Sequence, residues 1–140
     1  MRKSLRIEDA ASLILEKHGN DYWATVPELQ GCYSVGKSIE DAVDNVREAI
    51  KEYLEDVPEG MEIEQKFYNS NLKFNIKYDL QVFFEKFKML NKTVIAEKAE
   101  INPSLLRQYS TGLAFASEKQ KAKIENAIHQ IAQSLLESSL

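Results

Sequence analysis

The sequence predicts an α+β protein, in which a small β-β-β-α-β sheet domain precedes an all-α domain. Three observations lead to this prediction. Apolar and polar side chains alternate in residues 22–26, as in a strand with one buried face. Apolar side chains recur at helical spacing in residues 38–54. From residue 80 onward, the apolar pattern is helical throughout.

The sheet domain is expected to begin with an antiparallel hairpin. Residues 11–17 and 22–26 form its strands, because Gly19 and the polar residues after it favour a turn. Pro27 ends the second strand, since proline has no N–H to donate to a ladder. Residues 32–35 are a candidate third strand.

The second strand predicts two different faces. Tyr22, Ala24 and Val26 share one face, and Trp23 and Thr25 share the other. Trp23 is either part of the core or an exposed aromatic anchor for a partner, and the sequence leaves both readings open.

Ser38 is expected to cap a helix, with Asp41 at the N3 position of a capping-box-like start. A polar connection after this helix leads to residues 73–78, whose alternating apolar residues predict the last strand. One stripe of the helix is apolar and should face the core: Ile39, Val43, Val46, Ile50, Tyr53 and Leu54.

Four helices are expected after the sheet, at residues 80–90, 91–99, 102–110 and from Ser117 to near the C-terminus. The last of these is long and has one apolar face: Ile124, Ala127, Ile128, Ile131, Leu135 and Leu136.

Charge divides the chain in the same way. Residues 1–79 hold ten Lys and Arg against sixteen Asp and Glu, a net charge of −6, whereas residues 80–140 have a net charge of +2. We therefore expect a short extension (1–10), an acidic sheet domain (11–79) and a mildly basic helical domain (80–140) with different partners. Chance variation of surface charge is the alternative, since +2 is small for a DNA-binding domain. No apolar stretch is long enough for a membrane span, and the single cysteine suits a reducing cytoplasm.

Residues 91–112 predict a helix-turn-helix, in which the second helix enters the DNA major groove. Six residues lie at spacings that give the two short helices one core: Ile95, Ala96, Ala99, Ile101, Leu106 and Tyr109. Polar side chains between these positions can read bases or contact phosphates. The expected DNA-binding residues are Lys92, Asn102, Pro103, Ser104, Arg107, Gln108 and Thr111. An ordinary helical hairpin with solvated polar residues is the alternative.

No catalytic or metal-binding pattern emerges. His18 and His129 have no second ligand at metal spacing, and Cys32 is expected to be a buried thiol. The carboxylates of the first helix should face water or cap its start: Glu40, Asp41, Asp44 and Glu48. We expect no catalytic residue, no metal and no cofactor, and interpret the protein as a binding protein rather than an enzyme.

The run YWATVPELQGCYSVGKSIEDAVDNVREAIKEYLE resembles the N-terminal domain of HicB-type antitoxins. That family has an alternating strand, a Val-Pro-Glu-Leu-Pro-Gly-Cys-like turn, a short strand with Gly, and a Ser- or Thr-capped helix. The resemblance is close over residues 11–55. Gln30 stands where the family usually has Pro, and Glu100 replaces the Gly common between the two short helices of related DNA-binding domains.

The resemblance implies a degraded ribonuclease-H-like fold that lacks the catalytic acids. It also implies a HicA-type toxin partner, an mRNA-cleaving protein that the acidic domain would cover, with Trp23, Thr25 and Glu28 as expected toxin contacts. Family members often carry a C-terminal DNA-binding domain, form dimers or larger homo-oligomers, and repress their own operon.

Two alternatives remain. The first is a stand-alone transcriptional repressor whose N-terminal domain senses a small molecule or another protein. The second is an active nuclease of ribonuclease-H type, which would gather several carboxylates around Mg²⁺. The first strand offers only Glu16 for such a site.

Overall fold

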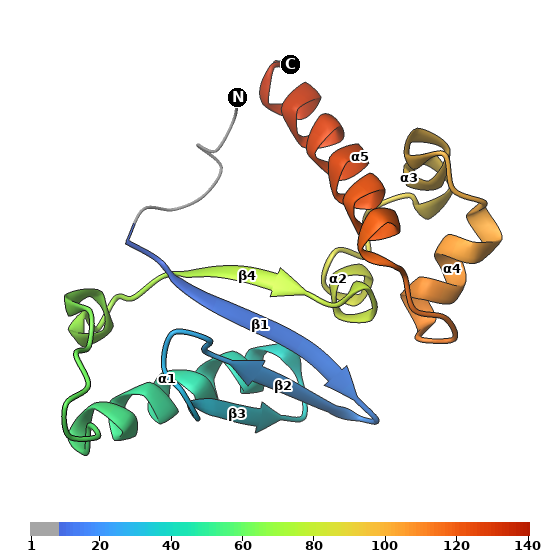
Figure 1. Cartoon of the computed structure of the whole chain (residues 1–140). Helices are drawn as coiled ribbons and strands as arrows, with labels where there is room; N and C mark the ends of the chain where they lie inside the picture. The colour runs from blue at the N-terminus through green and yellow to red at the C-terminus, as the bar shows by residue number, and fades with distance from the viewer. Residues whose placement is uncertain (1–8) are drawn as a thin grey trace. The chain divides into compact units, whose positions relative to one another are not determined.

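The computed structural model describes residues 9–140, and these residues form a four-stranded sheet, five α-helices and one 3₁₀ turn (Figure 1). The expected extension, residues 1–10, falls outside this range except for Asp9 and Ala10. The chain divides into two compact units, of which the first ends at Val82 and the second begins at Phe83.

The first unit has the predicted β-β-β-α-β order. Its strands are β1 (Ala11–His18), β2 (Asp21–Thr25), β3 (Tyr33–Gly36) and β4 (Phe74–Tyr78). They lie in the order β3-β2-β1-β4, in which β1 pairs antiparallel with β2, β2 antiparallel with β3, and β1 parallel with β4. The four predicted strands are confirmed, and their limits differ from the prediction by one residue at most ends.

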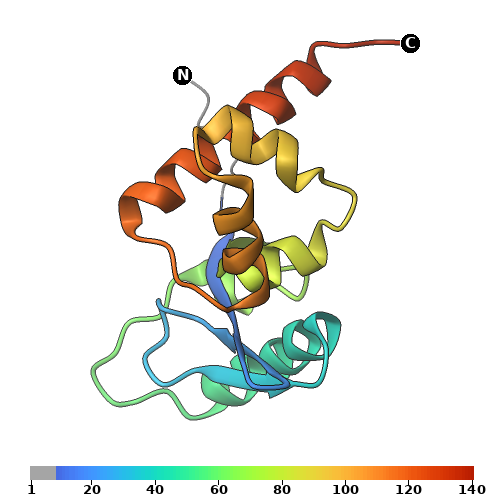
Figure 2. The same ribbon diagram turned by 90° about the vertical axis from the view of Figure 1, so that its right-hand side faces the viewer.

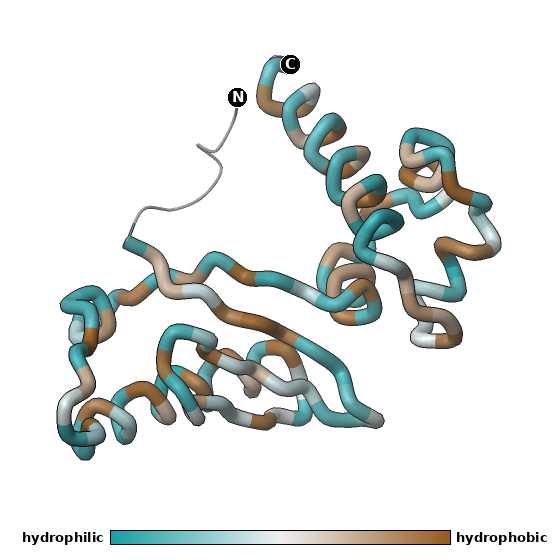
Figure 3. Tube along the Cα trace, viewed as in Figure 1, coloured by the Kyte–Doolittle hydropathy of each residue, from teal (hydrophilic) through white to brown (hydrophobic). Residues whose placement is uncertain are grey.

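Helix α1 (Ile39–Glu55) covers one face of this sheet (Figures 1 and 2). Ser38 caps it as predicted, since the Ser38 hydroxyl accepts a hydrogen bond from the Asp41 N–H at 3.0 Å. Ala42, Val46 and Ile50 are buried along the helix, and the predicted apolar stripe packs against the core on either side of them. The apolar residues of β1 and α1 are coloured brown in Figure 3.

The sheet buries alternate residues beneath α1. Ala11, Leu13 and Leu15 of β1 have no exposed surface, and Tyr22, Ala24 and Val26, predicted to share one face, are all buried. Trp23 and Thr25 lie on the opposite side and are partly exposed. The period-2 geometry of a strand therefore assigns each side chain to the core or to the other face.

Strand β3 lies unusually close to the start of α1. The Ser34 hydroxyl donates to the Ala42 carbonyl at 2.8 Å, and the Asn45 side-chain amide donates to the Val35 carbonyl at 2.9 Å. Gly36 is buried where the backbones meet, because a Cβ at this position would lie 2.4 Å from the Ala42 nitrogen. Only glycine allows this approach.

Asp79 fixes the end of β4, a role that the sequence pattern did not reveal. Its N–H donates to the Leu15 carbonyl at 3.0 Å. One carboxylate oxygen accepts from the Lys17 N–H at 2.8 Å, and the other accepts from the Val82 N–H at 2.7 Å. Asp79 thus joins β1 to the first turn of the next helix, as a capping carboxylate does.

The connection between α1 and β4, expected to be polar, contributes apolar residues to the core. It contains a 3₁₀ turn, η2 (Gln65–Tyr68), which was not predicted. Phe67 and Leu72 of this connection are buried in the sheet core. Single apolar residues separated by polar ones show no period, so no sequence pattern assigns them to the core.

The four predicted helices of the C-terminal part are α2 (Leu80–Lys86), α3 (Lys92–Ala99), α4 (Pro103–Thr111) and α5 (Glu118–Leu136). Helix α2 ends four residues before the predicted limit of 90. The chain must leave the helical conformation before Asn91, which is extended and caps α3 by accepting from the Val94 N–H. Asn102 and Ser117 cap α4 and α5 as expected.

The second unit has its own core. All six predicted core residues of α3, α4 and the turn between them are buried, and Ile124 and Ala127 of α5 are buried as well. The predicted apolar face of α5 continues beyond these residues, but Leu135 and Leu136 are 68% and 64% exposed. The end of α5 therefore offers apolar surface that this unit leaves uncovered.

Gly36→Ala should lower the free energy of unfolding by about 2–3 kcal/mol, because the added Cβ would overlap backbone atoms of α1. Denaturant titration monitored by circular dichroism measures the change. Gly60→Ala adds a Cβ that meets no atom within 4 Å, and its φ of +83° should cost only about 1 kcal/mol, so it shows the effect of Gly→Ala without overlap. Equal effects of the two substitutions would show that the approach of β3 to α1 is not the constraint.

Candidate interaction surfaces

The sheet side opposite α1 is the first candidate site, and we call it the outer face. Register places its side chains, because paired residues of neighbouring strands point to the same side. Glu16 lies opposite Trp23, which in turn lies opposite Val35, and Thr25 lies opposite Tyr33. The outer face comprises Ser12, Ile14, Glu16, His18, Asp21, Trp23, Thr25, Tyr33, Val35, Asn75 and Lys77.

Two of the three expected toxin contacts, Trp23 and Thr25, lie on the outer face. Tyr33, on the edge strand, is 53% exposed and was not singled out from the sequence. Tyr33 and Val35 are two positions apart, which places them on the same face of a strand. A four-residue strand is too short, however, for this alternation to predict which face is exposed.

The third expected contact, Glu28, makes contacts within the sheet unit. One carboxylate oxygen accepts from the Ser12 N–H at 2.7 Å, and the other is 2.7 Å from the Lys66 ammonium. The Lys66 ammonium also donates to the Ala10 carbonyl at 3.2 Å. Glu28 thereby ties the loop after β2 to the start of β1 and to η2.

The ion pair shifts the pKa values of both Glu28 and Lys66. Burial raises the pKa of Glu28, but hydrogen bonds from Lys66 and the Ser12 N–H outweigh burial and leave that pKa below its ordinary value. The hydrogen bond to Glu28 raises the pKa of Lys66. The side chains are only 16% (Lys66) and 26% (Glu28) exposed, so water screens the pair less than a surface ion pair.

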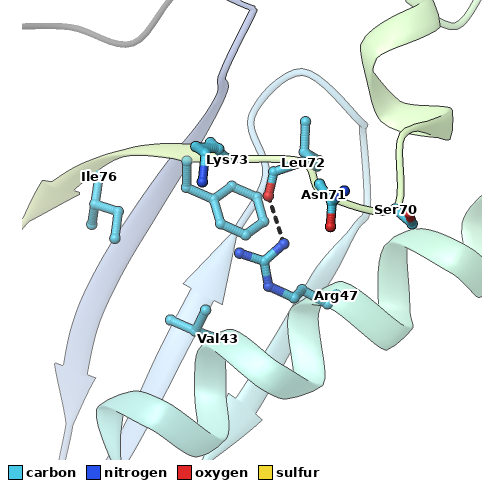
Figure 4. Close-up of a pocket in the computed structure, with 8 residues that line it drawn as sticks. Val43, Arg47, Ser70, Asn71, Leu72, Lys73 and Ile76 are labelled. Atoms are coloured by element: carbon cyan, nitrogen blue, oxygen red, sulfur yellow. Dashed lines mark hydrogen bonds between the residues drawn. The ribbon is translucent and has the colours of Figure 1, made fainter.

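A groove of about 500 Å³ lies between α1 and the start of β4 (Figure 4). Arg47 crosses it, with its guanidinium 4.6 Å from the Phe74 ring centroid and a 2.6 Å hydrogen bond to the Leu72 carbonyl. Val43 and Ile76 supply apolar walls, and none of the lining residues is acidic, a histidine or a cysteine. The groove offers two cations and apolar surface, and its one hydroxyl, on Ser70, has no histidine or carboxylate among the lining residues to activate it.

The described residues show no metal-binding constellation: they contain no group of three or more His, Cys, Asp or Glu that could hold an ion. The Glu16 carboxylate lies 3.9 Å from the His18 imidazole, Oε1 to Nε2, on the outer face. Cys32 is buried as predicted, and burial raises the pKa of its thiol. Across residues 9–140, no helix combines the length and apolar character needed to cross a membrane.

Helices α3 and α4 form the second candidate site. Glu100 ends α3 in the left-handed conformation, with a φ of 58°. The Ile101 N–H then donates to the Ala96 carbonyl at 2.9 Å. Asn102 accepts from the Ser104 N–H at 2.8 Å, and Pro103 occupies the first helical position. The turn therefore forms with glutamate where related domains commonly have glycine.

The exposed side of α4 carries the expected polar stripe. Ser104, Arg107, Gln108 and Thr111 are all exposed and follow the i, i+3, i+4, i+7 spacing of one helix face. In the described part of the chain, the Arg107 guanidinium has no ion-pair partner. Its five donors are available to a ligand.

The remaining expected DNA contacts are placed differently. Lys92 is half-buried, with its ammonium 5.9 Å from the Phe84 ring centroid. Asn102 is exposed but its side chain caps α4, and Pro103 is half-buried. Directly after α4, Leu113 and Phe115 are 80% and 91% exposed, which the sequence reading did not anticipate.

In comparison with known proteins, residues 12–110 match the family described as "HicB_like antitoxin of bacterial toxin-antitoxin system". A UPF0150 protein of Helicobacter pylori is 52% identical over 44 residues, and a UPF0150 protein of Archaeoglobus fulgidus is 38% identical over 45 residues. Each alignment covers 31% of this chain, and 61% and 65% of the respective relatives. No solved structure matches the chain with significant similarity.

Glu28→Gln should lower the free energy of unfolding by about 1–2 kcal/mol near pH 7, because it removes a charge-assisted contact to Lys66. A lowered folded-state pKa stabilises the fold above the unfolded pKa, and this contribution is lost as pH falls through the folded pKa. The difference from wild type should therefore shrink in acid. Denaturant titrations at several pH values test this, with Glu62→Gln as an exposed control; a constant difference would exclude the pair as its cause.

Proposed function

This chain belongs to the HicB-like antitoxin family of bacterial toxin–antitoxin systems, and on that premise we propose that it binds and neutralises a HicA-type mRNA-cleaving toxin and represses its own operon. The match over residues 12–110 carries the proposal, because this range includes the sheet except for Ala11, as well as α3 and most of α4. The proposed site of action is the cytoplasm, in keeping with a single free, buried cysteine.

The proposed toxin-binding unit is the sheet. Residues 1–79 carry a net charge of −6, which favours association with a basic protein and steers its approach at low salt. If the toxin grips RNA phosphates with basic residues, an acidic cover competes for the same surface. The outer face, with Trp23 and Thr25, offers partly exposed aromatic and β-branched side chains of the kind that protein interfaces use.

We propose that this unit is a binding module of ribonuclease-H-like descent and has no enzymatic activity. The strand order β3-β2-β1-β4, with β4 parallel to β1, supports the likeness. Glu16 has Trp23 and His18 beside it rather than further carboxylates, so a two-metal nuclease centre has no support there.

The proposed DNA-binding unit is the pair α3 and α4, acting as a helix-turn-helix. Arg107 can form two hydrogen bonds with guanine, and Gln108 can form two with adenine. Ser104 and Thr111 lie on the same helix face and can contact the phosphate backbone on either side.

A homodimer would present two copies of α4 to a palindromic operator, with recognition helices about 34–36 Å apart. The exposed apolar end of α5, with Leu135 and Leu136, supports dimer or larger homo-oligomer formation through this helix.

One observation favours the second candidate, a stand-alone repressor that senses a small molecule. The groove beside Arg47 combines a guanidinium with apolar walls, and a carboxylate-bearing ligand would suit it. The Arg47 contact to the Leu72 carbonyl gives this residue a structural task already, so the antitoxin proposal has the stronger support.

Co-expression tests the antitoxin proposal. The chain should co-purify in a stable complex with the product of the neighbouring reading frame, a small basic protein. The complex should elute as one peak in size-exclusion chromatography, and its apparent affinity should fall as salt increases. Absence of such a partner, together with intact operator binding, would favour the stand-alone repressor.

Arg107→Ala should weaken operator binding by about 1–3 kcal/mol and relax the base preference at one position, if Arg107 contacts guanine through two hydrogen bonds. Gel-shift titration with wild-type and single-base-substituted operators measures both effects. Lys123→Ala removes the same charge from an exposed site on α5 and should leave base preference unchanged. Unchanged binding by Arg107→Ala would remove Arg107 from the interface.

A further inference from the structure

Three aromatic rings lie together on the outer face. The Trp23 and Tyr33 rings are stacked, with centroids 5.4 Å apart and an interplanar angle of 8°. The His18 ring meets Trp23 edge-on, at 5.7 Å and 84°. These residues come from β1, β2 and β3, so backbone pairing holds the rings in place. We call them the aromatic cluster.

The rings are not sealed beneath other side chains. Tyr33 lies on the edge strand and is 53% exposed, and the His18 side chain is 59% exposed. Offset stacking of Trp23 and Tyr33 fixes ring orientation before any partner arrives, which reduces the entropy that binding must remove. A rigid, partly exposed pair of large rings is typical of the anchor of an interface.

An incompletely neutralised carboxylate borders the aromatic cluster. Glu16 is the cross-strand partner of Trp23, and its side chain is 46% exposed. Its nearest basic group within the described chain is His18, at 3.9 Å. Asp21, on the same face, is already paired with Lys37 at 2.7 Å. Lys77 is also on this face, on strand β4 beside β1, but among the ion pairs of the described residues none joins it to Glu16.

We propose that the aromatic cluster and Glu16 form the receptor for an arginine side chain on the basic surface of the toxin. A guanidinium can stack on an aromatic ring and donate hydrogen bonds to a carboxylate at its edge, so one arginine satisfies both features. This inference rests on the proposed antitoxin function and adds the chemistry by which the sheet recognises its partner.

Charge argues against nucleic acid as the occupant, although stacked aromatic rings on a sheet can also bind bases. A single-stranded nucleic acid needs a positively charged groove along its backbone. Here Glu16 lies beside the rings, and residues 1–79 have a net charge of −6. A cationic side chain is therefore the occupant that this surface favours.

Tyr33→Leu keeps apolar area at the site but removes the ring. With the product of the neighbouring reading frame as the probe, the full chain carrying Tyr33→Leu should bind roughly 3–30-fold more weakly in calorimetric titration. Tyr33→Phe keeps the ring and should bind like wild type. Tyr68→Leu is the matched control, since Tyr68 is 52% exposed but lies in η2, outside the outer face.

Glu16→Gln tests the contribution of the carboxylate to binding while leaving the three rings unchanged. It should weaken binding several-fold and reduce the dependence of affinity on salt, because one opposite-charge contact is lost. Glu48→Gln, on the exposed side of α1, makes the same charge change away from the outer face and should have little effect.

Trp23 is the chain's only tryptophan, so a ¹⁹F-labelled tryptophan in the antitoxin reports on the aromatic cluster alone. Its resonance should shift when the toxin binds, and addition of single-stranded RNA without toxin should not shift it. An RNA-induced shift would overturn the proposal in favour of nucleic acid. If Tyr33→Leu changed the oligomeric state of the chain but not its affinity for the toxin, the proposal would be overturned in favour of a homodimer contact.

Toxin binding by the wild-type chain distinguishes failure of the antitoxin function from failure of the arginine receptor. If the wild-type chain does not bind the product of the neighbouring frame, the antitoxin function and this inference both fall. If wild type binds but Tyr33→Leu and Glu16→Gln bind equally well, only the arginine receptor is overturned, and the antitoxin function stands.

Discussion

One helix covers one face of a four-stranded sheet, and the arrangement of the first unit depends on this constraint. Because α1 packs on Leu13, Leu15 and Ala24, the alternate residues of the same strands must point away from it. The contact is close enough that β3 admits only glycine at position 36. Burial of the apolar residues therefore also determines which polar and aromatic side chains the protein presents to a partner.

Local signals of the sequence account for most of the elements. Turn and capping residues such as Ser38 and Asn102 mark where helices begin, because their side chains satisfy N–H groups that the helix leaves free. Periodicity identified the buried residues of α3 and α4 correctly, since these helices share one core and each has a single buried side. Where propensity, pattern and capping agree, sequence alone predicted the structure.

Interactions between distant positions could not be predicted in the same way. Glu28 and Lys66 are 38 positions apart, and Lys17 and Asp79 are 62 apart, so no local pattern relates them. Glu28 was expected as a toxin contact, and no local pattern revealed that its carboxylate also joins three segments of its own unit. Glu100 shows the reverse: a local preference for glycine is overcome, since the Ile101 hydrogen bond and burial hold the turn.

Charge also separates the two proposed partners. A phosphate backbone is repelled by an acidic sheet, and with Glu16 beside the stacked rings the outer face accepts cations better than anions. On α4, by contrast, Arg107 offers donors and no described residue neutralises it. In the proposed function, a basic protein and a duplex therefore bind different units of one chain. Residues 1–79 carry a net charge of −6 and residues 80–140 one of +2, so the proposed assignment of partners follows the difference in charge between the two parts of the chain.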